Sequence, residues 1–144
     1  MNKTVYIGTY YHLLDDKNRF FLPAKLRKKT KNFIITSGID KCLYIYSKDI
    51  WEKIISKFDN LQIFDKSKER AFKRMFLANA VEVENDNQGR IVLPNTLKLQ
   101  ANIKKEVVII GVGNRLELWS KELWQKYYNK SKKIFEKLSR KLEF

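Results

Sequence analysis

Two arginines, each four residues after an aspartate, are the side chains of this chain best suited to recognise a ligand. Arg19 follows Asp15, and Arg90 follows Asp86. Arginine carries a planar fork of donors that can pair with two acceptors on the edge of a guanine, and a neighbouring carboxylate can orient that fork. The spacing therefore indicates a contact with nucleic acid. The alternative is an ion pair that only fixes a turn, which contributes about 0–1 kcal/mol when exposed.

The two motifs belong to an internal repeat. Residues 15–26 and 86–97 both read Asp-x-(Lys/Gln)-(Asn/Gly)-Arg-x-x-Leu-Pro-x-x-Leu, an offset of 71 residues. Asn18 and Gly89 occupy equivalent positions, and both residue types tolerate a positive φ. This exchange is typical of a tight hairpin turn, in which the following strand returns beside the preceding one. A two-stranded β-ribbon with an arginine at its tip fits the major groove of DNA.

The same order of elements is expected in both halves of the chain. Runs of β-branched and aromatic residues predict strands at 4–14, 19–22, 33–37, 43–46, 80–86, 90–93, 107–111 and 116–119. Pro23 suits the start of a short helical turn over 24–29, and Ser47 suits the N-cap of a helix that continues to Phe58. Further helices are predicted over 67–77 and from 120 to about 142.

The chain of 144 residues is expected to form one domain from two copies. A half of about 50 residues buries too little surface to be stable alone, so the halves are expected to share one core. We predict an α+β fold with a first repeat over 5–47, connecting helices over 48–75, a second repeat over 76–119 and a C-terminal helix over 120–144.

The C-terminal helix is longer than its counterpart after Ser47, and it carries an apolar face from Trp124 to Leu142. This face is expected to cover its own sheet in the first two turns, or to meet a neighbouring subunit. A contact with a membrane surface is a further alternative, because basic amphipathic helices make such contacts.

The charge of the chain favours a polyanionic partner. Its formal net charge is +14, from 30 basic and 16 acidic residues. Residues 15–31 hold seven basic and two acidic side chains, a net charge of +5 around the first turn. The expected DNA contacts are Arg19, Lys17, Arg90, Lys25, Arg27, Lys28 and Gln88. The residues expected to build the turns and orient the arginines are Asp15, Asn18, Asp86 and Gly89.

Little in the sequence points to an enzyme. His12 and Cys42 are the only residues of their types, and neither has a catalytic partner nearby in the sequence. No phosphate-binding glycine loop or metal-ligand spacing occurs, so no cofactor is expected. No apolar run approaches the ~18 residues of a membrane span. Residues 1–4 lead directly into strand-like sequence and not into a signal peptide. We therefore expect a cytoplasmic protein without a membrane partner.

Residues 11–19, 22–25, 86–90, 93–94 and 111–119 together resemble the MraZ family, and the resemblance spans nearly the whole chain in the right order. It implies a tandem fold similar to the AbrB-type swapped hairpin, with two repeats sharing one β-barrel-like core, assembled into a ring-shaped homo-oligomer. It further implies a nucleoid-associated transcriptional regulator that binds short direct repeats in double-stranded DNA upstream of its own division and cell-wall operon.

The motif of that family maps residue by residue onto this chain, with its arginines at Arg19 and Arg90, its aspartates at Asp15 and Asp86 and its lysine at Lys17. Two departures occur. Asn18 replaces the usual glycine, which the turn tolerates, and Gln88 lacks the charge of Lys17. The two tips are therefore expected to contribute unequally.

Two other function classes remain as alternatives to a DNA-binding regulator. One is an antitoxin-like module of AbrB fold that binds a protein partner, which a neighbouring gene for a small toxin would indicate. The other is an RNA-binding accessory protein, because a surplus of basic residues does not distinguish RNA from DNA.

Overall fold

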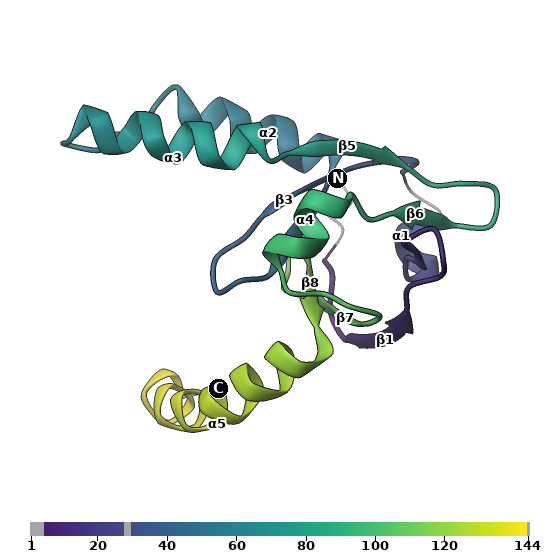
Figure 1. The fold of residues 1–144 in the computed structure, drawn as a ribbon. Coiled ribbons are helices and arrows are strands. Elements are labelled where there is room, and N and C mark those ends of the chain that lie inside the picture. The colour runs from purple at the N-terminus through teal and green to yellow at the C-terminus, as the bar shows by residue number, and fades with distance from the viewer. Residues whose placement is uncertain (1–4, 28–29, 144) are drawn as a thin grey trace.

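The structure is a computed structural model that describes residues 5–27 and 30–143, and it has the predicted α+β architecture (Figure 1). Its strands are β1 (Thr9–Leu13), β2 (Arg19–Phe21), β3 (Asn32–Ser37), β4 (Leu43–Ser47), β5 (Val81–Glu84), β6 (Arg90–Val92), β7 (Glu106–Gly111) and β8 (Leu116–Ser120). Its helices are α1 (Ala24–Arg27), α2 (Lys48–Phe58), α3 (Lys66–Ala78), α4 (Asn95–Gln100) and α5 (Lys121–Leu142). Lys28 and the predicted end of the first helical turn lie outside the described residues.

The strand order shows how the two repeats combine. Six strands form an antiparallel sheet in the order β1-β7-β8-β4-β3-β5, and β2 pairs antiparallel with β6 in a separate two-stranded sheet. The equivalent strands of the two repeats are β1 and β5, β3 and β7, and β4 and β8. Exchanging the members of each pair gives the same six-strand order read backwards, so the sheet has a pseudo-twofold axis between β4 and β8. The outer strands are exchanged between repeats, because β1 pairs with β7 and β5 pairs with β3.

Both repeats supply the same hydrophobic core, as the sequence predicted. Phe20 and Phe33 from the first repeat, and Ile91 and Ile109 from the second, belong to one cluster of fully buried side chains. The leucine of each repeated Leu-Pro pair is also in this cluster. Deletion of a large core side chain such as Phe20 would cost about 3–5 kcal/mol. The Leu-Pro part of the motif therefore anchors the adjoining loop to the core.

The predicted hairpin is wrong in its strand pairing. The sequence places the strand before Asp15 beside the strand that starts at Arg19, but β1 pairs with β7, and β2 pairs with β6. Exchange between repeats brings Phe20 directly opposite Ile91 in the shared core, which a local hairpin would not do. β1 also begins at Thr9, five residues later than predicted, after Gly8 takes a φ of +98°.

The helices after Ser47 and Ser120 are capped as the sequence indicates. The hydroxyl of Ser47 accepts a hydrogen bond from the backbone N–H of Ile50, and that of Ser120 accepts one from Leu123. A side-chain acceptor at this position satisfies one of the free N–H groups of the first turn. Asp65 caps α3 in the same way.

The two long helical arms differ in what covers them. In the first repeat α3 packs on α2, with the rings of Trp51 and Phe76 stacked 5.4 Å apart and those of Phe58 and Phe72 at 6.0 Å. In the second repeat α5 is one continuous helix. Its first turns pack on Trp119, but farther along Phe135 is 72% exposed. The first turns of α5 therefore cover the sheet, as expected, and the alternative of a contact with a neighbouring subunit stays a prediction.

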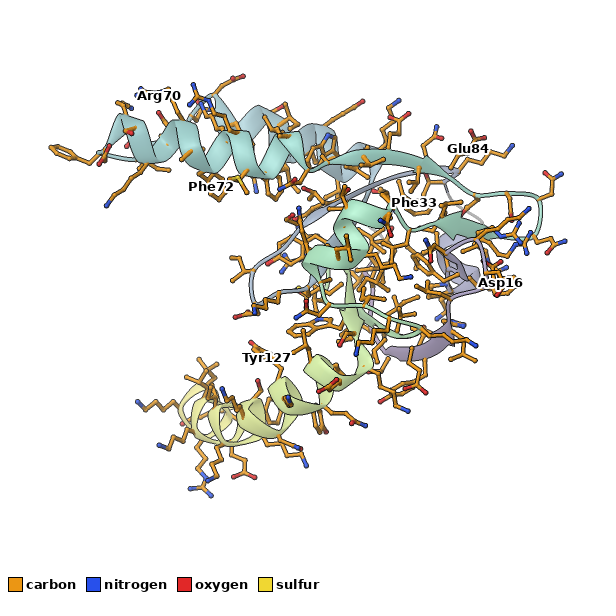
Figure 2. The ribbon with its side chains drawn as sticks, in the orientation of Figure 1. Asp16, Phe33, Arg70, Phe72, Glu84 and Tyr127 are labelled. Atoms are coloured by element: carbon orange, nitrogen blue, oxygen red, sulfur yellow. The ribbon has the colours of Figure 1, made fainter. Side chains whose placement is uncertain are left out.

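Both arms lie at the end of the molecule opposite the repeated loops (Figure 1). Asp16 marks the first loop on one side of Figure 2, and Phe72 and Tyr127 mark the arms on the other. Among the helices of residues 5–27 and 30–143, none is both long and apolar enough to cross a membrane.

Candidate nucleic-acid interface

The first Asp-x-x-x-Arg segment forms a tight loop around one carboxylate. Asp15 Oδ1 accepts hydrogen bonds from the backbone N–H groups of Lys17 at 2.9 Å and Arg19 at 2.8 Å. The backbone closes the loop, because Asn18 donates to the carbonyl of Asp15 and Asp15 donates to that of Arg19, both at 3.0 Å. Asn18 has a φ of +59°, as the turn prediction required. Residues 15, 18 and 19 therefore define the loop together.

The second segment repeats this geometry. Asp86 Oδ1 accepts hydrogen bonds from the backbone N–H groups of Gln88 and Arg90, both at 2.9 Å. Gly89 takes the place of Asn18, with a φ of +81°. The two loops thus have the same backbone hydrogen bonds despite sharing only part of their sequence. We call them the first recognition loop (15–19) and the second recognition loop (86–90).

Each aspartate also holds the arginine that closes its loop. Arg19 Nε donates to Asp15 Oδ2 at 2.6 Å, and Arg90 Nε donates to Asp86 Oδ2 at 2.8 Å. Because the bond uses Nε, it fixes the plane of the guanidinium while the two Nη nitrogens point farther from the backbone. The Arg19 side chain is 28% exposed and that of Arg90 is 19% exposed. Two oriented forks of donors therefore reach the surface.

The fold brings the two recognition loops onto one surface. The ribbon of β2 and β6 that separates them is three residues long, which corresponds to about 10 Å. The loops also contact one another, because Arg90 Nη1 lies 3.8 Å from Asp15 Oδ2. Asp15 thus serves the arginines of both loops, and the four charged side chains form one network.

The loop geometry keeps both carboxylates ionised. The backbone N–H of Arg19, followed by its side chain, lowers the pKa of Asp15 below the ordinary value of 3.8. The backbone N–H and side chain of Arg90 lower the pKa of Asp86 in the same way. Hydrogen bonds to the charged form of an acid favour that form. At neutral pH both aspartates are therefore anionic anchors for the arginines.

The other predicted contact residues surround the loops in different ways. Lys17, Lys25 and Gln88 are exposed and available to a ligand. Arg27 is half-buried instead, and its Nη1 donates to the carbonyl of Gln88 at 3.2 Å. Lys28 lies outside the described residues.

One residue of this surface was missed by the sequence reasoning. Lys98 on α4 is half-buried, and its Nζ donates to Asn18 Oδ1 at 3.0 Å. A signal was present, because Lys98 occupies the same position in the second repeat as Arg27 does in the first. Aligning the repeats beyond the Leu-Pro-x-x-Leu pattern would have found it.

The residues considered for catalysis lie elsewhere. Burial raises the pKa of the Cys42 thiol to about 12, so the thiolate is scarce at neutral pH. His12 is half-buried on β1, where desolvation and then the charge of Arg27 lower its pKa. Within the described parts of the chain, no group of three or more histidine, cysteine or acidic side chains could hold a metal ion.

The fold and the paired loops define a duplicated α+β protein whose two equivalent arginine loops share one surface. A family model described as "MraZ protein, putative antitoxin-like" matches this chain twice, over residues 5–75 and 76–144. The transcriptional regulator MraZ of Thermoanaerobacter sp. (strain X514) is 44% identical over 138 residues, which cover 95% of this chain and 96% of that protein.

A second relative gives the same picture. The transcriptional regulator MraZ of Carboxydothermus hydrogenoformans is 42% identical over 139 residues, which cover 96% of each chain. This chain belongs to the MraZ family, as the resemblance implied. The two family matches also confirm the tandem repeats. The relatives are named as regulators, and the family is not one of enzymes, which confirms the predicted non-enzymatic class.

Proposed function

We propose that this chain is a sequence-specific DNA-binding transcriptional regulator that reads base edges with Arg19 and Arg90. The observation that carries the proposal is the Nε bond from each arginine to the aspartate of its own loop. An arginine already fixed in its plane loses less conformational freedom when its Nη atoms pair with guanine O6 and N7. The names of the relatives as transcriptional regulators support the same class.

The residues around the loops supply the contacts to phosphate. Lys17, Lys25 and Gln88 are exposed beside the loops, and Lys28 follows α1 in the sequence. Contacts of this kind position the protein without reading sequence, and they make affinity fall steeply with salt. The net charge of +14 favours approach to DNA.

We further propose that copies of this chain associate, in a ring, through the exposed part of α5. In the first repeat Trp51 of α2 is covered by Phe76 of α3. Its equivalent on α5 is Trp124, and farther along that helix Phe135 and Leu138 stay 72% and 50% exposed. An apolar helix face of this kind is typical of an interaction surface. A ring would carry several pairs of recognition loops, and short direct repeats in DNA would then bind by avidity.

The proposed target is a set of short direct repeats upstream of the chain's own division and cell-wall operon, in the cytoplasm at the nucleoid. Protection mapping on DNA from upstream of its own gene tests this directly. We expect evenly spaced protected segments that disappear in Arg19→Ala. Inserting half a helical turn between repeats should strongly weaken binding, and binding that ignores the spacing would contradict the ring.

A second candidate is an antitoxin-like module that binds a protein, which the family description "antitoxin-like" favours. Co-expression with the product of a neighbouring gene for a small toxin would test it, with a stable complex as the supporting result. An RNA-binding role is tested by a competition experiment, in which duplex DNA or structured RNA competes with the labelled upstream DNA fragment for the protein at moderate salt. Duplex DNA should displace the labelled fragment. Displacement by structured RNA at an equal concentration would favour an RNA-binding role.

A further inference from the structure

Each recognition loop is held by a basic side chain from the other repeat. Arg27 on α1, in the first repeat, donates from Nη1 to the carbonyl of Gln88 in the second recognition loop at 3.2 Å. Lys98 on α4, in the second repeat, donates from Nζ to Asn18 Oδ1 in the first recognition loop at 3.0 Å. Since Arg27 and Lys98 are equivalent positions of the repeat, the two contacts are related by its pseudo-twofold symmetry.

The backbone crosses between repeats at the same places. Leu93 donates its N–H to the carbonyl of Asn18 at 2.8 Å, and Leu22 donates to the carbonyl of Gly89 at 3.2 Å. These leucines are the buried anchors of the repeated motif. Each loop tip is therefore tied to the other repeat through one backbone bond and one basic side chain.

The two basic side chains match the residue that each one meets. A Cβ added at Gly89 would overlap the Arg27 side chain, so any larger residue there must displace Arg27 and also adopt a φ of +81°. Asn18 has a φ of +59° and offers the side-chain oxygen that Lys98 uses. Arginine is thus paired with glycine in one contact, and lysine is paired with asparagine in the other.

The bonds that Arg27 and Lys98 already make argue against a direct phosphate contact. Arg27 Nε is buried without a hydrogen-bond partner among the described residues and its exposed Nη1 is bonded to Gln88, whereas Lys25 on the same helix is exposed. Lys98 is likewise half-buried, with its Nζ on Asn18. A charged donor that already bonds to the protein has less to offer a phosphate.

We propose that Arg27 and Lys98 are positioning residues that hold each recognition loop against the opposite repeat and so fix the spacing between Arg19 and Arg90. This inference rests on the proposed DNA-binding function. It assigns Arg27 to loop positioning instead of the phosphate contact that the sequence suggested. The recognition surface is then one rigid unit made jointly by both repeats.

Salt dependence distinguishes positioning from phosphate contact. Arg27→Met and Lys98→Met are titrated by fluorescence anisotropy against a duplex from upstream of the chain's own gene, at several salt concentrations. Each should lower affinity about tenfold, as for a lost charged hydrogen bond, with the slope against log salt unchanged. The matched control Lys25→Met removes an exposed charge and should reduce that slope by about 1. An unchanged affinity, or a slope reduced as in Lys25→Met, would overturn the assignment.

An exchange of partners tests the pairing itself. Gly89→Asn places a side chain against Arg27 and should weaken DNA binding. The double variant Gly89→Asn with Arg27→Lys recreates the asparagine–lysine contact of the other loop and should recover most of the affinity. A double variant that binds no better than Gly89→Asn alone would refute the pairing.

Amide hydrogen exchange without DNA separates this inference from the proposed function. Lys98→Met should speed exchange in residues 15–19, and Arg27→Met should speed it in residues 86–90, because local opening controls exchange. Equal exchange in wild type and variants would overturn the positioning role, whatever the chain binds. Faster exchange in a chain that fails to bind duplex DNA would uphold the positioning role and reject the proposed function.

Discussion

Arg19→Lys is the substitution that most directly tests base reading, because it keeps the charge and removes the fork. Arg19 uses Nε for Asp15, at 2.6 Å, and has two Nη nitrogens left for a second partner. Lysine has three donors on one tetrahedral nitrogen and lacks the planar fork that holds the aspartate through Nε while matching two acceptors of a guanine. The variant should therefore keep its attraction to DNA and lose discrimination between bases.

The expected loss of base discrimination follows from the one bidentate arginine–guanine pair that the substitution removes. A bidentate arginine–guanine pair contributes about 1–3 kcal/mol of discrimination against a wrong base, a factor of roughly 5–150 in affinity. The salt slope should stay at the wild-type value, because the number of positive charges near phosphate is unchanged. Arg19 should be more sensitive than Arg90, which is less exposed, at 19% against 28%, and also lies near Asp15.

The assay compares the mapped repeat with duplexes in which each guanine is replaced in turn by adenine. Wild type should lose affinity at one or more of these guanines, and Arg19→Lys should bind the original and the substituted duplex alike. Lys25→Arg serves as the control, since a point charge on phosphate carries no sequence information. If Arg19→Lys retains the wild-type ratio between the two duplexes, Arg19 does not read a base.

Three further predictions concern the loops and the thiol. Gly89→Ala and Gly113→Ala should each cost about 1–2 kcal/mol in urea unfolding, because both glycines have positive φ, +81° and +95°. Gly89→Ala should also weaken DNA binding, because its Cβ would overlap the Arg27 side chain. Gly113→Ala should leave DNA binding unchanged, because a Cβ there meets nothing within 4 Å, and an equal loss of DNA affinity in the two variants would contradict the role of Arg27. The pKa values of Asp15 and Asp86 are lower in the folded chain than the value of 3.8 expected for the unfolded chain. The two carboxylates therefore stabilise the folded state fully above pH 3.8, and this stabilisation is lost as the pH falls through their pKa values in the folded chain. Carboxylate titration by NMR should show both midpoints below 3.8, and a midpoint at or above it would be inconsistent with the loop geometry. Cys42, with a pKa of about 12, should resist iodoacetamide at pH 8 until the chain is unfolded, and rapid labelling of the native protein would show that it is accessible.

Local features of the fold were predictable because their causes are local. Ser47 and Ser120 precede apolar residues at helical spacing, and both act as caps in the structure. The positive φ of Asn18 follows from its exchange with Gly89 between repeats. The loops and the capped helices were therefore placed correctly from the sequence.

Contacts between the repeats were not predictable by the same reasoning. A turn with a good hairpin sequence does not reveal that its strands pair elsewhere, because β2 meets β6 only through the shared core. The repeat alignment singles out Lys98 as the equivalent of Arg27, but not its contact with Asn18, which is 80 residues away. The spacing did indicate that Asp15 and Asp86 orient the arginines, but the atoms that form the bond, Nε and Oδ2, depend on geometry that residue spacing does not supply.

The exchange of outer strands has a consequence for synthesis on the ribosome. Thr9 on β1 pairs with Ile110 on β7, so the first strand to emerge waits for about a hundred further residues. At ordinary rates of translation this wait lasts roughly 5–20 s. During that time β1 lacks β7 and both of its edges are open, whereas in the finished sheet it is an edge strand with one open edge, and an open edge is a template for pairing with other chains. Synthesis of β7 is thus the event that gives β1 its neighbour, and nascent chains in crowded polysomes are the state most exposed to mispairing.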